Sequence, residues 1–459
     1  MSRHTLTTAT TAVLALAVLA LVPSTTGVTT SAAAAKAAST SATRGLPEPR
    51  PLIADTPIVP ADTMSPPTTY HCRVTYGIPC YSPLQLRRAY GINKLRSQGL
   101  TGHGAVIAIV DSFGSPTIRH DLHVFDHAYG LADPPKFRIV RPVGPIPAFN
   151  PDSADMRGWA GETTLDVEYA HAMAPQATII LAETPVSETE GVHGFPQIMD
   201  AERWLIHHTN VGVISQSFGA TEPTFPSATS IQNLRYAFQA ARNNRVTVLG
   251  GSGDLGSTDY RADMRHHFDH RVNSWPSSDP LVTSVGGTEV HLDAKGARTS
   301  ADTVWNDPWG ASGGGLSHVF SRPAFQQSVK SVVGTHRGTP DISLNAAVMS
   351  RVTTYSTFPG QPAVWGFAAG TSEATPLFAG IVALAIEKAH RRLGDINAAL
   401  YSLQGASSDG IVDVTGGDNG FDGVPGWPVV AGYDLGTGWG TVNAATFVPA
   451  LVAAVKALS

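Results

Sequence analysis

The run Val106-Ile107-Ala108-Ile109-Val110 is continuously apolar and ends directly before Asp111. An apolar run of this length predicts a buried strand. Similar runs alternate with helical patterns along the chain, which predicts strands at 178–181, 211–215 and 246–249 and helices at 161–173, 198–208, 231–243 and 375–390. This alternation predicts an α/β fold in which helices flank both faces of a mostly parallel central sheet.

The composition gives the chain enough apolar material for a sizeable core. Of its 459 residues, 42% are hydrophobic and 15% are charged, and the formal net charge is −5. A nucleic-acid partner would require a basic patch, and since no strong block of one sign occurs we expect no such partner. The 45 glycines and 33 prolines predict many tight turns and long loops.

The N-terminus has the pattern of a secretory signal peptide over residues 1–35. Arg3 and His4 precede an apolar run at 12–22, and small residues follow at 31–35. A membrane-spanning helix needs roughly 20 apolar residues, which is more than this run supplies. We therefore expect cleavage to release a secreted, extracellular protein without membrane association. The alternative is an N-terminus that tethers the protein to a membrane.

The segment that follows the signal has no sustained periodicity. Residues 36–80 are rich in Ser, Thr, Ala and Pro, which predicts a linker or a short pro-segment. Order is expected to begin near Ser82, within a folded domain over 81–459. The only two cysteines, Cys72 and Cys80, lie in the segment, and in an exported protein we expect them to form a small disulfide loop. Two free thiols near a flexible arm are the alternative.

The sharpest local motif is Gly370-Thr371-Ser372, shortly before the predicted apolar helix. A serine at a helix N-terminus meets free amides and a helix dipole that favour a developing negative charge. The glycine two residues earlier lets the backbone turn tightly and lets a substrate approach. Alone, the motif is more typical of an ordinary N-cap.

A pair of acids takes the place where a catalytic histidine might stand. Glu162 and Asp166 are four residues apart in the predicted helix at 161–173, so they share one face. On a solvated helix they would be an ordinary acidic face. A buried pair cannot ionise twice easily, so one proton is shared and one pKa rises. Such a pair can act as a general base in acid, where histidine is protonated.

A glycine-rich loop carries a third acid. Residues 251–257, Gly-Ser-Gly-Asp-Leu-Gly-Ser, follow the predicted strand at 246–249, so Asp254 projects from the carboxyl edge of the sheet. An Asx-turn is the alternative role of an aspartate in such a loop. A protonated Asp254 would instead donate a hydrogen bond to an oxyanion.

Together and in this order, these motifs resemble the sedolisin family of serine-carboxyl peptidases, from about Tyr81 to the C-terminus. The matching elements are Tyr81-Ser82-Pro83-Leu84-Gln85-Leu86, Leu165-Asp166-Val167-Glu168 with Ala174-Pro175, the Ser252-Gly253-Asp254 loop, Gly370-Thr371-Ser372 with Pro376, Asp413-Val414 and Gly432-Tyr433-Asp434. The resemblance implies a subtilisin-like fold with Ser372 as the nucleophile and Glu162 as the general base. It implies that Asp166 orients Glu162 and shares its proton, and that Asp254 supplies the oxyanion hole. Hydrolysis of protein or peptide substrates would proceed through an acyl-enzyme at acid pH.

The resemblance also implies one structural calcium ion near the C-terminus. Asp413 and Asp434 are hard oxygen ligands among glycine-rich turns, where backbone carbonyls are accessible. The family pattern adds the carbonyls of Val414, Val430 and Gly432 to the shell. An acidic, turn-rich loop without a metal is the alternative.

Three positions depart from the family pattern. Phe218 stands where tryptophan is common, Leu255 where a small polar residue is common, and Ala369 where serine is usual. None of them removes a candidate catalytic group, but together they leave room for altered specificity or reduced activity. The first alternative is a non-catalytic binding protein on a protease scaffold, against which the presence of all four candidate residues argues.

The second alternative is a histidine-dependent serine hydrolase that uses His171, five residues after Asp166. The strand that ends in Asp111-Ser112 resembles the one that bears the catalytic aspartate of subtilisins. A buried strand that ends in a polar turn explains it equally well, and no His-Gly-Thr-His element follows.

Overall fold

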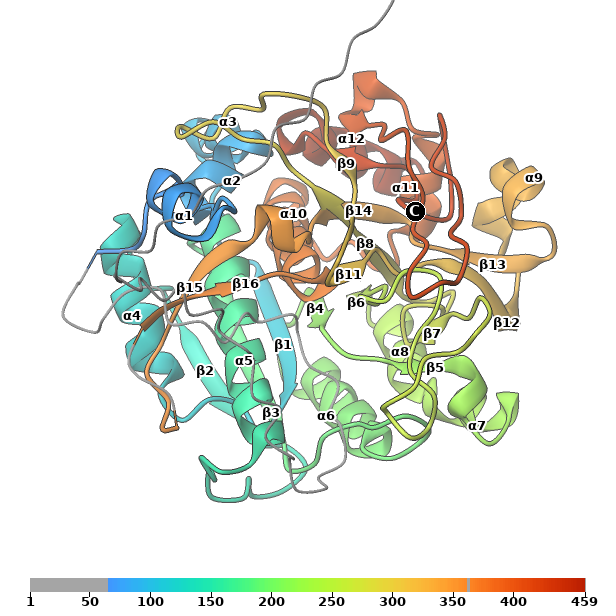
Figure 1. Cartoon of the computed structure of the whole chain (residues 1–459), viewed down its shortest axis with the longest axis horizontal. Coiled ribbons are helices and arrows are strands. Elements are labelled where there is room, and N and C mark those ends of the chain that lie inside the picture. Colours follow the sequence, from blue (N-terminus) through green and yellow to red (C-terminus); the bar gives the residue numbers. More distant parts are fainter. Residues whose placement is uncertain (1–64, 361–363, 459) are drawn as a thin grey trace, which may run out of the picture. The chain divides into compact units, whose positions relative to one another are not determined.

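The central sheet is parallel, as the alternation of elements predicts. The computed structural model describes residues 65–360 and 364–458, so the predicted signal peptide at 1–35 lies outside the described residues. Across the sheet (Figure 1), the strands run in the order β2 (Phe137–Val140), β3 (Thr178–Thr184), β1 (Val106–Ser112), β4 (Val213–Gln216), β6 (Thr247–Gly251), β8 (Thr283–Glu289) and β14 (Ile342–Asn345). Neighbours in this order are parallel, and β9 (Thr303–Val304) pairs antiparallel with β8.

Helices cover both faces of the sheet. They are α5 (Ala154–Met173) and α10 (Thr371–Ala389) on one face, and α6 (Phe195–His208) and α8 (Tyr236–Asn243) on the other. Successive side chains of a strand point to opposite faces. Accordingly, Ile107 and Ile109 of β1 belong to the core beneath α5 and α10, whereas Ala108 and Val110 belong to the core beneath α6 and α8. Burial on both faces explains why β1 is apolar without alternation.

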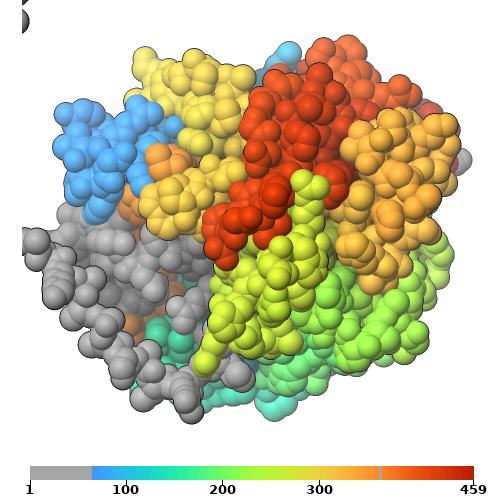
Figure 2. Space-filling model, turned by 45° about the vertical axis from the view of Figure 1, so that its right-hand side comes forward, coloured from blue at the N-terminus to red at the C-terminus, as the bar shows by residue number. Residues whose placement is uncertain are grey.

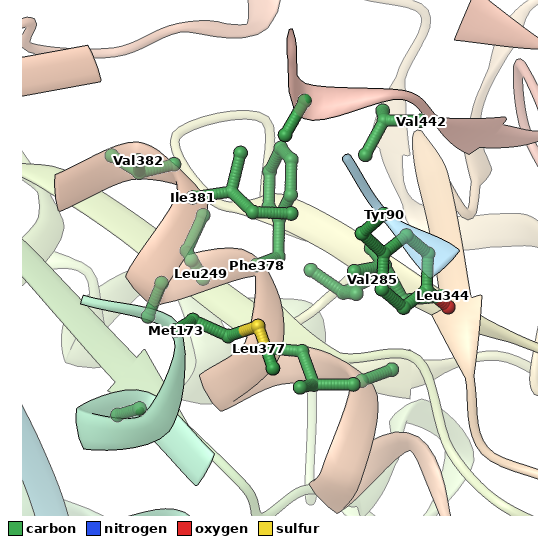
Figure 3. Packing of buried hydrophobic residues seen from close by; sticks show 14 of the residues in the cluster. Tyr90, Met173, Leu249, Val285, Leu344, Leu377, Phe378, Ile381, Val382 and Val442 are labelled. Atoms are coloured by element: carbon green, nitrogen blue, oxygen red, sulfur yellow. The ribbon is translucent and has the colours of Figure 1, made fainter. Parts of the chain in front are cut away.

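Helix α10 runs through the interior. Every residue from Thr371 to Ile386 is buried. Figure 3 shows Leu377 and Phe378 of this helix close to Leu249 of β6 and Val285 of β8. Each such side chain contributes roughly 1.5–3 kcal/mol relative to exposure. Among the described helices, α10 included, none has the length and apolarity that a membrane crossing requires.

The boundaries of three helices differ from the predicted ones. Helix α5 begins at Ala154 rather than 161, because the Ser153 hydroxyl accepts the Met156 amide and caps it. Helix α10 begins at Thr371 rather than 375, so Pro376 lies inside it and removes one backbone hydrogen bond, the one to the Ser372 carbonyl. The predicted helix at 231–243 is two helices, α7 (Ala228–Leu234) and α8, with Arg235 between them.

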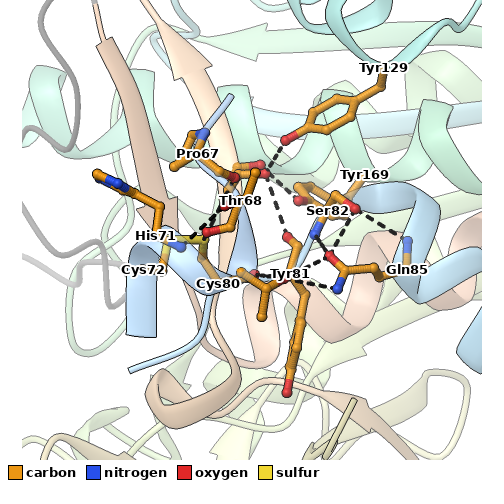
Figure 4. The surroundings of a disulfide bond; sticks show 12 residues. Pro67, Thr68, His71, Cys72, Cys80, Tyr81, Ser82, Gln85, Tyr129 and Tyr169 are labelled. Atoms are coloured by element: carbon orange, nitrogen blue, oxygen red, sulfur yellow. Dashed lines mark hydrogen bonds between the residues drawn. A yellow bond between two sulfur atoms is a disulfide. The ribbon is translucent and has the colours of Figure 1, made fainter. Parts of the chain in front are cut away.

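Order begins earlier than the predicted start near Ser82. Helix α1 (Thr69–Tyr76) is folded, and the predicted disulfide between Cys72 and Cys80 is present. Figure 4 shows the disulfide beside Thr68, and the hydroxyl of the next residue, Thr69, donates to the Cys80 carbonyl at 2.9 Å. These contacts join 69–80 to α2 (Pro83–Ala89), so this part of the expected linker belongs to the folded unit.

The remaining elements complete the layers around the sheet. The helices are α3 (Ile92–Ser97), α4 (Ile118–Tyr129), α9 (Lys330–Val333), α11 (Asn397–Ser402) and α12 (Ala444–Ala457). The short antiparallel pairs are β5 (Ala220–Thr221) with β7 (Ser274–Trp275), β10 (Asn306–Asp307) with β11 (Gly310–Ala311), β12 (Gly315–Ser321) with β13 (His336–Thr339), β15 (Val352–Ser356) with β16 (Val364–Ala368), and β17 (Ile411–Val412) with β18 (Thr441–Val442).

The loop after β6 lies against the C-terminal segment. Figure 2 shows them side by side in yellow-green and red. The guanidinium of Arg271 donates to the carbonyls of Pro425 and Gly426, and it lies 3.9 Å from the centre of the Trp427 ring. This contact joins one wall of the cleft described below to the glycine-rich C-terminal turns.

Candidate active site

The candidate residues meet at the carboxyl edge of the central strands. Asp111 lies near the end of β1, Ser217 directly follows β4, and Asp254 lies in the loop after β6. Helix α10 begins at the same edge with Ser372 in its first turn. This edge is where α/β folds place their ligand sites.

Gly370, not Ser372, is the N-cap of α10. Its φ is 111°, and a Cβ at this position would stand 2.7 Å from Asp254 Oδ2. Glycine is therefore required for both the backbone conformation and the close approach of Asp254. Ser372 is free of a capping role, and its side chain lines a cleft.

Glu162 and Asp166 form a buried pair rather than a solvated acidic face. Both lie in α5 and are at most 1% exposed. The Ser217 hydroxyl donates to Asp166 Oδ1 at 2.9 Å. Within the described part of the chain, both Glu162 oxygens and Asp166 Oδ2 lack a hydrogen-bond partner of standard geometry. An unpaired buried carboxylate is costly, which favours the protonated form.

Burial is the main cause of the raised pKa of both acids. The pKa of Glu162 lies well above its ordinary value because of desolvation and then the nearby Asp111, and the neighbouring Ser372 hydroxyl partly offsets the rise. The pKa of Asp166 is raised by desolvation, by Asp111 and by Glu162 itself. Ser372 and Glu162 are therefore neighbours without a fully formed hydrogen bond. The two acids titrate as a coupled pair.

Asp111 is a third carboxyl of this cluster, and sequence reasoning did not include it among the site residues. It is 1% exposed, and burial raises its pKa to about 7 although the Thr163 hydroxyl lowers it. Its place at the end of the first buried strand was the available signal. That signal does not reveal how close α5 lies, which only the packing decides.

Asp254 is held against the start of α10. Its Oδ1 accepts hydrogen bonds from the Thr371 amide at 2.7 Å and from the Thr371 hydroxyl at 2.8 Å. Burial raises the pKa of Asp254 to about 6, and the bonds from Thr371 limit the rise. Below about pH 6 this carboxyl is neutral and has a proton to donate. An Asx-turn does not describe this geometry, because the partner lies on α10.

One cleft joins these groups. It has a volume of about 310 Å³, and Glu162, Ser217, Asp254 and Ser372 all line it. Phe218 also lines the cleft, with its ring 6.2 Å from that of Phe195. The hydroxyl of Ser372 and the carboxyl groups of Glu162 and Asp254 thus face the same space.

His171 does not belong to the cleft. It is fully buried, with Nε2 3.0 Å from the Ala132 carbonyl oxygen and 3.2 Å from Asp126 Oδ2. Among the residues that line the cleft, His267 is the only histidine, and its Nδ1 pairs with Asp422 Oδ2 at 2.8 Å. The histidine-dependent alternative through His171 is therefore wrong.

The candidate calcium ligands lie on turns that are tied together. Asp413 Oδ2 accepts the Gly432 amide at 3.0 Å, and the buried carboxylate of Asp434 accepts the amides of Val430 and Thr437 at 3.1 and 2.7 Å. Burial raises the pKa of Asp434 to about 6.

The donor set fits a hard cation. Within the described residues, the carbonyl oxygens of Val414, Val430 and Gly432 accept no hydrogen bond from the protein. In 65–360 and 364–458, no three or more His, Cys, Asp or Glu side chains are grouped in a way that could hold a metal ion, so backbone carbonyls would have to complete any shell. Two carboxylates and three free carbonyls are oxygen ligands of the kind that Ca²⁺ takes, whereas a transition metal would need nitrogen or sulfur.

The fold and the serine at the head of a buried helix define a subtilisin-like protein. The model of the subtilase family matches residues 156–398. Kumamolisin of Bacillus sp. (strain MN-32) is 33% identical over 350 residues, which are 74% of this chain and 57% of that protein. Sedolisin of Pseudomonas sp. (strain 101) is 30% identical over 362 residues, or 76% of this chain and 58% of that protein.

The solved structures give the same result. The serine-carboxyl proteinase Pseudomonas sedolisin, complexed with two molecules of pseudo-iodotyrostatin, superposes with a TM-score of 0.67 at 27% identity. The superposition covers 81% of this chain and 98% of that structure. This chain belongs to the sedolisin family. It spans a little more than half the length of the curated relatives it matches.

Proposed function

We propose that this chain is a serine-carboxyl peptidase that hydrolyses peptide bonds of protein or peptide substrates. The observation that carries the proposal is that Ser372, Glu162 and Asp254 line one cleft. A carboxyl lies beside the serine hydroxyl, where a subtilisin would have a histidine. The family relationship supports the same chemistry.

In the proposed reaction, the Ser372 hydroxyl attacks the scissile carbonyl and Glu162 accepts its proton. A bond forms between Ser372 Oγ and the carbonyl carbon, and the carbon–nitrogen bond breaks as the amine leaves with the proton from Glu162. Water then attacks the acyl-enzyme with Glu162 again as the base, which frees the acid product and Ser372. Asp166 shares the proton of the pair and orients Glu162.

Asp254 is proposed to stabilise the oxyanion. Its protonated carboxyl donates to the negative oxygen of the tetrahedral intermediate, while the Thr371 amide and hydroxyl hold the other oxygen of Asp254. The role requires a neutral Asp254, so the proposed activity is an acid one.

We also propose that the protein is secreted and that it holds one structural calcium ion. The signal pattern at 1–35 and the disulfide support export. The carboxylates of Asp413 and Asp434, with the carbonyls of Val414, Val430 and Gly432, would hold the ion. Bound there, Ca²⁺ would stabilise the turns and supply no catalytic group.

A peptide-library digest at several pH values, followed by mass spectrometry, tests the main proposal. Cleavage is expected in acid, and the Ser372→Ala variant should lose it by at least about 10⁴-fold while its melting temperature and circular dichroism stay those of the wild type. Full activity of a pure, folded Ser372→Ala variant would show that another residue is the nucleophile. Absence of cleavage by the wild type at every pH would contradict the proposal itself.

A further inference from the structure

Ser372 lies between two residues that are both hydrogen-bonded to the end of β14. Before it in the chain, the Gly370 amide donates to the Ala346 carbonyl at 2.7 Å. After it, Glu373 Oε1 accepts a hydrogen bond from Nδ2 of Asn345 at 2.8 Å. Asn345 is the last residue of β14, a strand of the central sheet, and Ala346 follows it. The start of α10 is therefore tied to the sheet on both sides of the proposed nucleophile.

Asn345 is a rigid partner for Glu373. It is fully buried, and its Nδ2 also donates to the Ser350 carbonyl at 2.8 Å. Its Oδ1 accepts the Val290 amide at 3.2 Å, and its backbone amide donates to the Tyr90 hydroxyl at 2.7 Å. Since both hydrogens of its side-chain amide are used, rotation of the Asn345 side chain would break several hydrogen bonds at once.

Glu373 is fully buried and does not reach the cleft. Of the described residues, those that line the cleft include Ser372 but not Glu373. Burial raises the pKa of Glu373 well above its ordinary value, and the bond from Asn345 offsets part of the rise. An apolar side chain of similar length would fill this position without burying a carboxyl group, so the bond from Asn345 is what distinguishes glutamate here. Glu373 can therefore act on the reaction only through the position of its neighbour Ser372.

The first turn of α10 depends on such contacts because one of its helical hydrogen bonds is missing. Pro376 has no N–H for the Ser372 carbonyl, and the Ser217 hydroxyl lies 3.5 Å from that carbonyl oxygen. The preceding residue, Thr371, is held by Asp254, to which its amide and its hydroxyl donate. The residues on both sides of Ser372 thus have anchors outside the helix, while its own side chain lines the cleft.

We propose that Glu373 is a positioning residue for the nucleophile. Its bond from Asn345, with the bond from Gly370 to β14, fixes the rotation of the first turn of α10 and hence the direction of the Ser372 hydroxyl. A misplacement of about 1 Å can cost about 100-fold in rate, because attack requires the reacting atoms to be aligned and nearly in contact. This inference rests on the proposed function and adds to it a residue that sets the rate without touching the substrate.

Two substitutions of Glu373 test the inference at acid pH, well below the melting temperature of each variant. Glu373→Leu removes the acceptor and should lower kcat by about 10–100-fold, while KM stays within about twofold of the wild type. Glu373→Gln keeps Oε1 as an acceptor in a neutral side chain of the same length. It should therefore retain kcat within about threefold of the wild type.

Asp121→Ala is the control for a general loss of stability. Asp121 is a fully buried acid of α4, and its two oxygens accept the hydroxyls of Thr117 and Thr357, both at 2.6 Å. Its removal should lower the melting temperature but keep kcat within about threefold of the wild type, because Asp121 does not contact the start of α10 or line the cleft.

A Glu373→Leu variant with the kcat of the wild type, or one in which only KM changes, overturns the inference and leaves the peptidase proposal intact. A Glu373→Gln variant as slow as Glu373→Leu overturns it as well, because the acceptor would then not position the turn. If Glu373→Leu does not fold, Glu373→Asp takes its place, since its shorter side chain withdraws the oxygen from Asn345. The same loss of kcat is expected, and an unchanged kcat overturns the inference.

If the wild type cleaves no peptide at any pH, the peptidase proposal fails and crystal structures of the wild type and Glu373→Leu decide the inference. A shift of Ser372 Oγ by about 1 Å or more relative to Asp254 supports the positioning role. An unchanged place of Ser372 Oγ overturns it.

Discussion

The hydroxyl of Ser217 donates a hydrogen bond to Asp166 Oδ1 at 2.9 Å and thereby links the end of β4 to the buried acid pair of α5. The same hydroxyl lies 3.5 Å from the carbonyl oxygen of Ser372. That carbonyl lacks its usual helical partner because Pro376, four residues later, has no N–H. Ser217 is therefore placed to position both the acid pair and the start of α10.

Removal of that hydroxyl should change the pH profile as well as the rate. The bond to Ser217 lowers the pKa of Asp166, so its loss in Ser217→Ala raises the pKa of the coupled pair further. The acid limb of kcat/KM is expected to move to higher pH, with a loss in kcat of about tenfold. Ser217→Thr, which keeps the hydroxyl, is the control. An unchanged acid limb in Ser217→Ala would show that the bond is only structural.

The alkaline limb of the pH–rate profile should report the ionisation of Asp254. Since the proposed donor is the neutral acid and burial raises its pKa to about 6, activity should fall as the pH rises through about 6. Asp254→Asn keeps a donor and should flatten this limb, whereas Glu162→Gln removes the base and should cost about 10²–10⁴-fold at every pH. A neutral-to-alkaline optimum of the wild type would sink this assignment. Rate profiles from pH 3 to 9 decide it.

Buried carboxyl groups outside the candidate active site predict that the folded protein is more stable at acid pH than at neutral pH. Glu202 of α6 is fully buried, Gln216 donates to it, and burial raises its pKa from 4.5 to about 8. Because the folded-state pKa is the higher one, the folded protein holds this proton more tightly than the unfolded chain does. The contribution is complete below about pH 4.5 and is lost as the pH rises through about 8.

Glu202→Gln should remove this dependence. The variant is expected to match the melting temperature of the wild type near pH 4 and to exceed it at pH 8, by a free energy on the order of a few kcal/mol. Asp152→Asn, at an exposed acid, should change neither value. Equal slopes of melting temperature against pH in Glu202→Gln and the wild type would contradict the prediction.

Calcium removal should act on stability before it acts on chemistry. An ion that binds only the folded state stabilises by about 2.7 kcal/mol at a hundredfold excess over its Kd. A chelator is therefore expected to lower the melting temperature and to increase self-digestion. Asp434→Ala should have the same effect as the chelator, and added calcium should not raise the melting temperature of this variant. The site does not exist as proposed if chelation leaves the melting temperature unchanged and elemental analysis of the purified protein finds no calcium.

The disulfide should stabilise mainly the N-terminal arm. Cys72 and Cys80 are eight residues apart, and by loop entropy so short a loop contributes at most about 2–3 kcal/mol. The double variant Cys72→Ser/Cys80→Ser should therefore be cut by proteases near α1 before the rest of the protein unfolds. Limited proteolysis with mass mapping measures this order. First cuts elsewhere, or alkylation of both thiols without reduction, would contradict it.

The parallel sheet and the local motifs could be predicted from the sequence. The apolar run at 106–110 and the glycine at 370 each impose a conformation through nearby residues alone. The strand and the place of Ser372 near a helix N-terminus could therefore be predicted, although the helix begins four residues before the predicted start. The spacing of Glu162 and Asp166 likewise placed them on one helix face.

Contacts between distant segments could not be predicted in the same way. Asp111 joins the acid cluster only because α5 packs over the end of β1, and Glu190 and Asp259 line the same cleft although 69 residues separate them in the sequence. The start of order at Thr69 depends on a disulfide and on the buried bond from Thr69 to Cys80, which compensate for the missing hydrophobic periodicity. Each of these features depends on tertiary packing, and no local pattern encodes it.

The burial of α10 from Thr371 to Ile386 determines how the protein should lose activity on heating. Ser372, the proposed nucleophile, lies in the first turn of this helix, whose amides should be among the last to exchange with deuterium because the helix opens only when the whole core opens. Fraying at the surface cannot displace Ser372 gradually. Heat inactivation should therefore follow a single exponential that coincides with deuterium uptake by α10, and residual activity should measure the fraction of molecules still folded.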